Sequence, residues 1–402
     1  MAQKLAKEYD VVVCGAGPAG LNAAYTLCSV SDGQCRVAIL DKKEPWREPV
    51  SCAEAVSKKA LEQFWPSNEA WIRQHLDGVY FTSPDGTKVD FTEDDCGYIL
   101  NRALFHREMA EKVEKKGAFC HFSAECKSLF RDSEGFWNVD VCIDGVISSV
   151  RAPVIVDATG PGAKLTHGVP LLETLEAGDN DLEPAIFAIV ENVEHNPKHI
   201  ELLFGNKYFP GGYGWVFPRD SKTVNIGLVN GRKYLKTHSP RVMLQQFLAK
   251  YYPSAVVKSI HGGAIACGQS LKPIAVAGFF KSGDAASCVN PISRSGIVEA
   301  LDSGHIVGEC AWKWLNTNST TEKKSIEAET YARWMKAQGN THLRLSKAKV
   351  AFSSIQDCHF DKAAHKLARI PQKNRTLFRI FFTVLCTSPS LLWKMRSFVY
   401  VR

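Results

Sequence analysis

The sequence contains no run of 18 consecutive apolar residues, the length that a transmembrane helix needs. Its first ten residues, MAQKLAKEYD, lack the long apolar stretch of a signal peptide. Thirteen cysteines are present, but they are scattered singly, with no Cys-x-x-Cys pair and no zinc-binding framework. Single cysteines of this kind are mostly small buried residues in a reducing compartment. We therefore expect a cytoplasmic protein without a metal site.

Acidic residues are absent after Asp361, so the end of the chain carries more positive charge than the whole net excess of +7. The nine basic residues that follow are Lys362, Lys366, Arg369, Lys373, Arg375, Arg379, Lys394, Arg396 and Arg402. Apolar side chains are mixed with them on both sides of Pro389, among them Phe378, Phe381, Phe382, Leu391, Leu392 and Trp393. One interpretation is peripheral contact with an anionic membrane surface. The other is a helical pair that packs on the rest of the protein. We expect no nucleic-acid partner.

The first forty residues have the pattern of a strand, a glycine turn, a helix and a second strand. Val11, Val12 and Val13 form a β-branched run typical of a buried parallel strand. A Gly-x-Gly-x-x-Gly turn, which brings backbone N–H groups to a pyrophosphate, then comprises Gly15, Ala16, Gly17, Pro18, Ala19 and Gly20. Asp41 lies 21 residues beyond Gly20, where a carboxylate binds a ribose 2′-hydroxyl and would repel the 2′-phosphate of NADP. The sequence therefore predicts a dinucleotide site, to which we also assign Lys42.

A second part of this site lies far along the chain. A nicotinamide dehydrogenase would keep its nucleotide site in one contiguous domain, but residues 275–304 carry another strand, loop and helix. They resemble the second FAD fingerprint of the flavoprotein hydroxylase superfamily. The resemblance implies that Gly283 and Asp284 hold the ribityl chain. It also implies that Gly296 and Ile297 approach the flavin ring, whose reduced form a helix N-terminus stabilises. We therefore predict non-covalently bound FAD.

Two further features extend this resemblance. Residues 154–165, VIVDATGPGAKL, resemble the intermediate strand-and-glycine motif of the superfamily. Arg102 lies where the superfamily often has a basic residue near the cofactor, although a solvated helix charge is an equal alternative. The expected fold class is α/β, hydroxylase-like, with a Rossmann-type FAD-binding domain, an inserted mixed β-sheet substrate domain and a helical C-terminal region. The expected bounds are 1–170 and 262–320 for the first, with parts of 45–100 lining the active site, 171–261 for the second, and 321–402 for the third.

The central segment PGGYGWVFPRD, residues 210–220, raises the question of what its aromatic residues contact. YGWVFP, a turn and TVNIGLV read as a β-hairpin, with Tyr213, Trp215 and Phe217 on one face of their strand. Together with PVSCAEAV (49–56) and GDAASCVNP, this segment closely resembles the geranylgeranyl reductase family, from about residue 8 to 310. Enzymes of that family use FAD to saturate isolated double bonds of prenyl chains.

The resemblance implies roles for several of these residues. Cys52 would lie close to the flavin as a catalytic residue, and Glu54 and Phe217 would contact the substrate. Tyr213 and Trp215 would border the lipid cavity and act in catalysis. An inert thiol at Cys52 and a packing role for the two aromatic residues remain open alternatives.

This chain departs from the family at two places. Ile292-Ser293-Arg294-Ser295 replaces the usual glycines after Asn-Pro, and Ala53 stands where glycine is common. Arg294 would then bind an anionic group of the substrate or pair within its own loop. Both changes put the prenyl substrate in question more than the fold.

Three functions remain open at this point. The resemblance favours a reductase of prenyl or other lipophilic substrates. An FAD-dependent monooxygenase or halogenase shares the FAD motifs, although halogenases carry two tryptophans where this chain has only Trp215. A flavin-binding redox sensor is a non-enzymatic alternative. Because no second dinucleotide fingerprint is present, NAD(P)H would bind transiently, or a reduced carrier protein would supply the electrons.

Overall fold

The computed structural model describes residues 5–170, 172, 182–237, 239–270 and 272–376, and five residues beyond these: 379, 382, 383, 386 and 387. The chain divides into two compact units, each assembled from three separate segments. Unit 1 is formed by Met1–Val50, Arg102–Leu182 and Ala266–Leu343. Unit 2 is formed by Ser51–Asn101, Glu183–Ile265 and Arg344–Arg402.

Unit 1 is built on a six-stranded sheet with the order β16-β17-β10-β1-β2-β6. All of its pairings are parallel except that of β16 with β17. Every residue of β1 and of β10 is buried, as expected of strands covered on both faces. The strands are β1 (Val11–Cys14), β2 (Val37–Asp41), β6 (Phe119–Phe122), β10 (Val154–Asp157), β16 (Ala275–Val276) and β17 (Phe279–Lys281).

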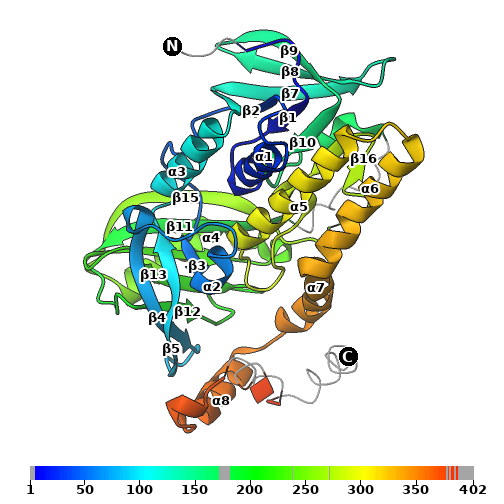
Figure 1. Ribbon diagram of the computed structural model, residues 1–402. Coiled ribbons are helices and arrows are strands. Elements are labelled where there is room, and N and C mark those ends of the chain that lie inside the picture. The colour runs from blue at the N-terminus through cyan, green and yellow to red at the C-terminus, as the bar shows by residue number, and fades with distance from the viewer. Residues whose placement is uncertain are drawn as a thin grey trace. The chain divides into compact units, whose positions relative to one another are not determined.

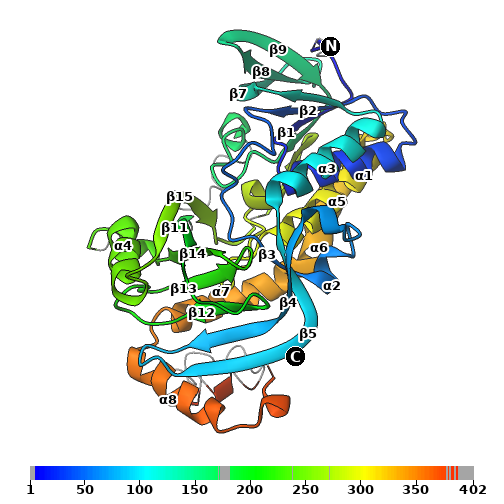
Figure 2. The same cartoon turned by 90° about the vertical axis from the view of Figure 1, so that its left-hand side faces the viewer.

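The helices of unit 1 pack closely on one another, and Figures 1 and 2 show α1 beside α5. A Cβ on Gly304 would lie 2.4 Å from the carbonyl oxygen of Ala19, and one on Gly308 would lie 2.7 Å from that of Ala23. The two backbones therefore touch where α5 has glycine. The helices are α1 (Pro18–Val30), α3 (Arg102–Lys115), α5 (Ile297–Leu315), α6 (Thr320–Trp334) and the start of α7 (Asn340–Phe352), which follows a π-helical turn at Met335–Gly339.

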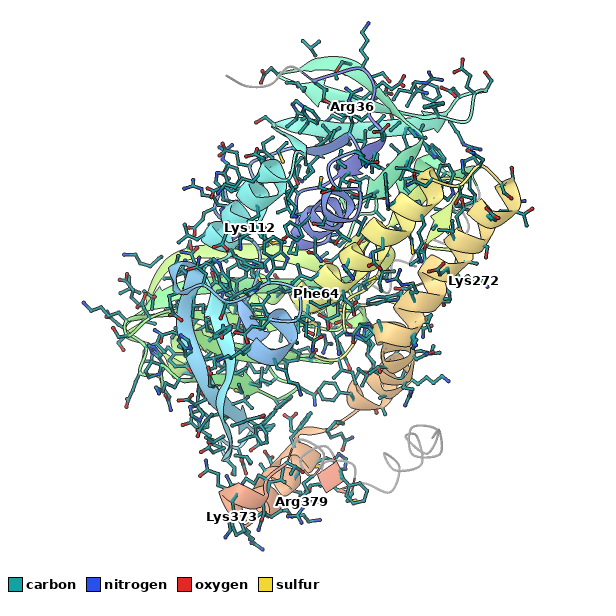
Figure 3. The ribbon with its side chains drawn as sticks, in the orientation of Figure 1. Arg36, Phe64, Lys112, Lys272, Lys373 and Arg379 are labelled. Atoms are coloured by element: carbon teal, nitrogen blue, oxygen red, sulfur yellow. The ribbon has the colours of Figure 1, made fainter. Side chains whose placement is uncertain are left out.

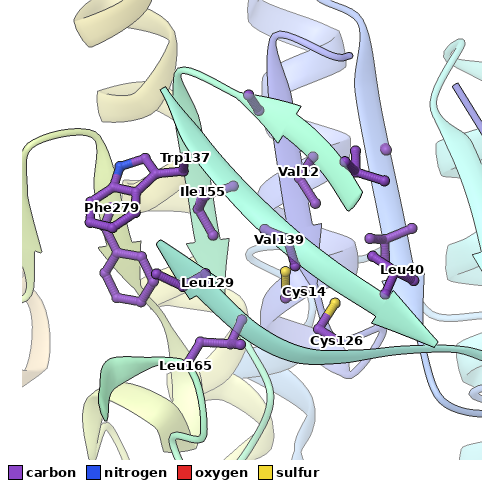
Figure 4. Close-up of a cluster of buried hydrophobic side chains, with 14 of the residues drawn as sticks. Val12, Cys14, Leu40, Cys126, Leu129, Trp137, Val139, Ile155, Leu165 and Phe279 are labelled. Atoms are coloured by element: carbon purple, nitrogen blue, oxygen red, sulfur yellow. The ribbon is translucent and has the colours of Figure 1, made fainter. Parts of the chain in front are cut away.

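A three-stranded antiparallel sheet, β7 (Ala124–Arg131), β8 (Trp137–Ile143) and β9 (Val146–Ala152), completes unit 1. Its inner face shares a core with the main sheet, in which Trp137 lies beside Phe279 and Cys14 is fully buried (Figure 4). The indole N–H of Trp137 donates to the carbonyl oxygen of Ala277 at 2.9 Å, so the buried ring keeps a polar partner.

Unit 2 contains a mixed eight-stranded sheet with the order β15-β11-β14-β13-β12-β4-β5-β3 (Figure 2). Only β12 and β4 pair in parallel among the pairings described. Tyr213 pairs with Val229 and Pro218 with Val224, which confirms the predicted hairpin. The strands are β3 (Ala55–Ser57), β4 (Ile72–Thr82), β5 (Lys88–Leu100), β11 (Leu182–Glu191), β12 (His199–Leu203), β13 (Tyr213–Pro218), β14 (Thr223–Val229) and β15 (Val256–Ala266).

Two longer helices cover parts of this sheet, and a shorter one, α2 (Lys58–Leu61), follows β3. Helix α4 (Pro240–Tyr251) contributes Leu244 and Phe247 to a core with β11 and β14. Helix α8 (Asp357–Ala368) packs Ala364 and Leu367 against Val89 of β5. The expected α/β hydroxylase-like architecture is confirmed, with a mixed sheet in unit 2 and helices toward the C-terminus.

The boundaries between segments differ from those expected. Residues 51–101 belong to unit 2, where β4 and β5 extend its sheet, rather than mainly to the FAD-binding domain. The C-terminal region is helical where it is described, but residues up to Leu343 group with unit 1 and those from Arg344 with unit 2. The chain alternates between the two units because strands from distant segments pair in each sheet. The main sheet of unit 1 takes strands from three segments and that of unit 2 from two, and no local pattern specifies these pairings.

The described start of the basic tail packs on unit 2. Arg375 donates to the carbonyl oxygen of Asp90 at 2.9 Å, while Lys373 and Arg379 are exposed (Figure 3). Most of the apolar residues on which the membrane interpretation depends lie outside the described residues: Phe378, Phe381, Leu391, Leu392 and Trp393. No helix in the described ranges is long and apolar enough to cross a membrane.

We expect Gly304→Ala to lower the free energy of unfolding by up to about 2 kcal/mol. The added Cβ would lie 2.4 Å from a backbone oxygen, and overpacking of this kind costs about 1–3 kcal/mol, more than alanine gains in helix propensity. Denaturant unfolding measures the change. Gly263→Ala is the control, because its Cβ would meet no atom closer than 3.9 Å. Equal stability of Gly304→Ala and wild type would contradict the close packing of α1 on α5.

Candidate functional site

The turn between β1 and α1 contains two glycines that the fold itself requires. Gly15 has a φ of 108°, and a Cβ there would lie 2.2 Å from the carbonyl oxygen of Ala158. A Cβ on Gly20 would lie 1.9 Å from the carbonyl oxygen of Gly15. These two positions let the helix begin directly against the end of β10, as the motif requires.

Gly17 differs, because a Cβ there would meet no atom within 4 Å. Its φ of −73° and ψ of 179° suit any residue, so neither backbone strain nor packing explains this glycine. It is the N-cap of α1, and Pro18 follows in the first turn. The open space therefore lies at the N-terminus of a 13-residue helix, where backbone N–H groups and the helix dipole favour a phosphate.

Asp41 and Lys42 lie at the end of the neighbouring strand β2. Asp41 accepts a hydrogen bond from the backbone N–H of Ala16 at 2.7 Å and another from that of Lys43 at 3.1 Å. The carboxylate is therefore held beside the glycine turn, with acceptor capacity left for a ribose hydroxyl. Lys42 is exposed.

The structure brings the two predicted fingerprints together within unit 1. Ala19 is buried, and a Cβ on Gly283 would lie 2.7 Å from its methyl group. Gly283 has a φ of 60° and begins a short 3₁₀ helix (Gly283–Ala286). Residues more than 260 positions apart thus form one continuous surface at the ends of β1 and β17.

Asp284 faces the start of α5. A Cβ on Gly296 would lie 3.7 Å from Oδ1 of Asp284, and Ile297, which is buried, is the first residue of the helix. Burial raises the pKa of Asp284 to about 6; the charge of Arg102 opposes this rise and that of Glu299 adds to it. A carboxyl group with this pKa can accept or donate a hydrogen bond near neutral pH.

Arg102 is buried, so its interpretation as a solvated helix charge is wrong. One guanidinium nitrogen donates to Nε2 of His106 at 2.7 Å, and Nδ1 of His106 donates to the carbonyl oxygen of Pro45 at 2.9 Å. Burial and the nearby Arg102 lower the pKa of His106 to about 3, so the imidazole is neutral. Arg102 is therefore held by a neutral histidine. His106 was not predicted as a site residue, although its position four residues after Arg102 on a predicted helix indicates that the two side chains are neighbours.

Arg294 lies in the loop before α5 with a φ of 57°, in a conformation that favours glycine. Its side chain is buried, and Nη1 donates to the carbonyl oxygen of Ile292 at 2.5 Å. Arginine therefore occupies a glycine-like backbone position and turns its guanidinium back onto its own loop.

Unit 2 holds the remaining predicted residues. Cys52 is half-buried, and its sulfur accepts a hydrogen bond from the backbone N–H of Glu54 at 3.2 Å. Glu54, which was expected to contact substrate, is instead paired: its two carboxylate oxygens accept from Nε and Nη2 of Arg219 at 2.8 and 3.2 Å. No local sequence pattern predicts this pair, because the residues are 165 positions apart.

The three aromatic residues of β13 stand on one face of the strand, as predicted. Trp215 and Phe217 are buried in the core of unit 2, and Tyr213 is half-buried beside them. The ring centroids of Tyr213 and Trp215 are 6.4 Å apart, and those of Trp215 and Phe217 are 6.3 Å apart. A Cβ on Gly227, opposite Trp215, would lie 2.2 Å from the indole ring. Packing thus fixes Trp215, and Tyr213 is the most accessible of the three.

Known proteins resemble this chain over nearly its full length. Residues 181–265 match the geranylgeranyl reductase catalytic domain. Digeranylgeranylglycerophospholipid reductase of Methanosarcina acetivorans is 29% identical, over 96% of this chain and 95% of that protein. The enzyme of the same name from Methanocella arvoryzae is 28% identical, over 96% and 97% respectively. The chain is thus similar to geranylgeranyl reductases, in the matched domain and over nearly its full length.

Solved structures show the wider fold class of this chain. A geranylgeranyl bacteriochlorophyll reductase-like protein from Thermoplasma acidophilum superposes with a TM-score of 0.88 at 20% identity, over 97% of this chain and 99% of that one. A variant of the flavin-dependent brominase Bmp2 reaches 0.71 at 16% identity, over 97% and 98%. A variant of halogenase PltM, solved with FAD, reaches 0.67 at 17% identity, over 98% and 86%. The chain therefore shares its fold with these reductase-like and flavin-dependent proteins.

We expect Gly17→Ala to leave the stability of the FAD-free protein nearly unchanged and to weaken FAD binding by about tenfold or more. Alanine fits the fold at this position, but its methyl group would occupy the open space at the N-terminus of α1, and a tenfold loss corresponds to about 1.4 kcal/mol. Flavin fluorescence titration and thermal unfolding separate the two effects. Gly20→Ala is the contrasting control, since it should destabilise the protein itself. Wild-type FAD affinity in Gly17→Ala would show that the phosphates lie elsewhere.

We expect the stability of the FAD-free protein to fall as the pH rises from about 4 to about 6, through Asp284. Because its pKa is higher in the folded protein than in the unfolded chain, folding favours the protonated form, and this contribution is lost as the carboxyl group ionises. The difference between pKa values of 3.8 and about 6 corresponds to roughly 3 kcal/mol at most. Denaturant unfolding of wild type and Asp284→Asn at several pH values isolates the effect. Parallel pH profiles for the two proteins would contradict it.

Proposed function

We propose that this protein is an FAD-dependent reductase that saturates carbon–carbon double bonds in the prenyl chains of a lipid. The observation that carries the proposal is its full-length similarity to digeranylgeranylglycerophospholipid reductases, together with the two fingerprints that meet at Ala19 and Gly283. By this analogy, the substrate class is a glycerolipid or a related lipid with unsaturated isoprenoid chains.

In unit 1, FAD would be held without a covalent bond. The N–H groups around Gly17 would bind its pyrophosphate, and Asp41 would bind the adenosine ribose. Asp284 would bind the ribityl hydroxyls, and the N-terminus of α5 at Gly296 would lie toward the flavin ring. Bound FAD supplies a hydride when reduced. Arg102, fixed by His106, would add positive charge to this unit, and buried positive charge favours an anionic ligand.

In unit 2, the aromatic face of β13 would receive the apolar chain. Tyr213 is the accessible member of this face, while Trp215 and Phe217 are buried behind it. Aromatic faces both exclude water and stabilise positive charge that develops on an alkene as it is protonated. Cys52 would hold the proton that the alkene receives in addition to the hydride. Arg294 would contact an anionic group of the substrate only by leaving its bond to Ile292.

The proposed electron donor is NAD(P)H or a reduced carrier protein. The described residues of unit 1 contain one dinucleotide-binding turn, at Gly15–Gly20, and we assign it to FAD. NAD(P)H would therefore reduce the flavin by transient contact, or a reduced carrier protein would do so. A reaction started with chemically reduced protein does not depend on which donor reduces the flavin.

We expect chemically reduced holoprotein, under anaerobic conditions, to convert digeranylgeranylglycerophospholipid in detergent to products that are heavier by two hydrogens per saturated bond. In deuterated water, the product should gain two deuteriums for each saturated bond, because the N5 hydrogen of reduced flavin exchanges with solvent and the added proton also comes from solvent. Mass spectrometry of the lipid measures both. The matched control is the Gly17→Ala protein, assayed at an FAD concentration below its raised dissociation constant for FAD.

Two outcomes would contradict the proposal. A product heavier by one oxygen, formed only in air, would identify a monooxygenase. An unchanged lipid, with flavin fully reduced and bound, would exclude this substrate class as the one reduced.

A further inference from the structure

We propose that Glu54 acts as a positioning residue for Cys52, through the conformation of its backbone, and that Arg219 and Asn225 hold the two residues in place. The proposal extends the proposed function, in which Cys52 takes part in catalysis. It assigns Glu54 no contact with substrate, and all of its residues belong to unit 2.

The backbone at Glu54 is in a conformation that a glutamate rarely adopts. Its φ is 76°, in the left-handed region that favours glycine. In this conformation the N–H of Glu54 points back to the sulfur of Cys52 at 3.2 Å. The carbonyl oxygen of Glu54 accepts from the N–H of Leu100 at 2.9 Å, so the turn is tied to β5. The strained turn therefore supplies a hydrogen-bond donor to the thiol.

The Glu54 carboxylate holds this turn closed. It accepts two hydrogen bonds from Arg219, one on each oxygen. Nε of Arg73 also lies 3.8 Å from Oε1, the oxygen that accepts from Nη2 of Arg219. The side chain of Glu54 is only 9% exposed, and that of Arg219 is 15% exposed. A carboxylate buried to this extent must stay paired, because the loss of its partner would leave a desolvated charge. Arg219 follows β13 directly, so the hairpin that carries the aromatic residues also anchors Glu54.

A second contact from the same hairpin reaches Cys52. The amide nitrogen of Asn225 donates to the carbonyl oxygen of Cys52 at 3.1 Å. The amide oxygen of Asn225 accepts from the indole N–H of Trp215 at 2.9 Å. Asn225 is fully buried, and Trp215 is fixed over Gly227. The Cys52–Glu54 turn is thus held through the main chain of Cys52 and through the side chain of Glu54.

The role of the Glu54 backbone can be tested on the thiol itself, without substrate. The rate constant for alkylation of Cys52 by iodoacetamide is measured at fixed pH by mass spectrometry of the peptide that contains it, since other cysteines such as Cys358 are also exposed. Cys52→Ser identifies that peptide. Cys52 is partly exposed, so the reagent can reach it, and loss of the N–H donor to its anionic form should slow the reaction.

We expect Arg219→Ala to slow alkylation of Cys52 by roughly threefold or more, as loss of one hydrogen bond to a charged group predicts. Arg219→Lys should have an intermediate effect, because lysine keeps the charge without the two-pronged geometry. Lys349→Ala is the matched control. It removes the partner of another buried carboxylate of unit 2, Glu183, at 2.8 Å, and should leave the rate unchanged.

A pair of double variants isolates the backbone. In Glu54→Gly with Arg219→Ala, no carboxylate remains, and glycine adopts a φ of 76° without strain, so the rate should return close to wild type. In Glu54→Ala with Arg219→Ala, the carboxylate is equally absent but alanine is strained at this φ, so the rate should stay slow. This comparison still decides the question if Arg219→Ala alone does not fold.

Equal rates in the two double variants, or an unchanged or faster rate in Arg219→Ala, would overturn the proposal. The alkylation pattern does not depend on any lipid. A protein that shows the expected pattern but reduces no prenyl chain would therefore retain the positioning role of Glu54 and lose the proposed function.

Discussion

Unit 1 depends on glycine at a few positions where two backbone segments are in direct contact. Helix α1 begins against the end of β10 because Gly15 and Gly20 leave room there, and it lies on α5 because Gly304 does. A Cβ at any of these positions would come within 2.4 Å of a backbone oxygen. The same close packing brings Gly283 onto Ala19, so that the glycine turn at Gly15–Gly20 and the loop of Asp284 share one surface.

In unit 2, buried hydrogen bonds and ion pairs hold the predicted site residues in place. The aromatic strand β13 could pack in its core without specifying any chemistry, but Trp215 also donates to Asn225, and Arg219 closes on Glu54. Asn225 in turn donates to the carbonyl oxygen of Cys52, two residues before Glu54, so both contacts lead to the short segment around Cys52. The hairpin therefore provides both the apolar face and the groups that hold the thiol.

The parts that the sequence predicted correctly are those with a local signal. They are local elements of the fold: the strand, glycine turn and helix at Val11–Val30, the strand, loop and helix at residues 279–315, and the β13–β14 hairpin, each formed by residues close together in the chain. The pairing of Glu54 with Arg219 and the bond from His106 to Pro45 join distant residues through tertiary packing, which spacing does not encode. Residues 51–101 were expected mainly with the FAD-binding domain but lie in unit 2 for the same reason. Strand β4 pairs in parallel with β12, which is more than 100 residues later in the chain. Burial of Arg102 likewise becomes evident only once α3 is packed.

The central claim is that reduced flavin on this protein passes its electrons to a prenyl double bond, and a single turnover tests it most directly. Holoprotein is reduced photochemically without oxygen and mixed with digeranylgeranylglycerophospholipid, while the visible absorbance of oxidised flavin is followed. The account predicts that this absorbance returns on addition of the lipid, with one bond saturated for each flavin reoxidised. Absorbance that returns only when oxygen is admitted, with the lipid double bonds intact, would contradict it.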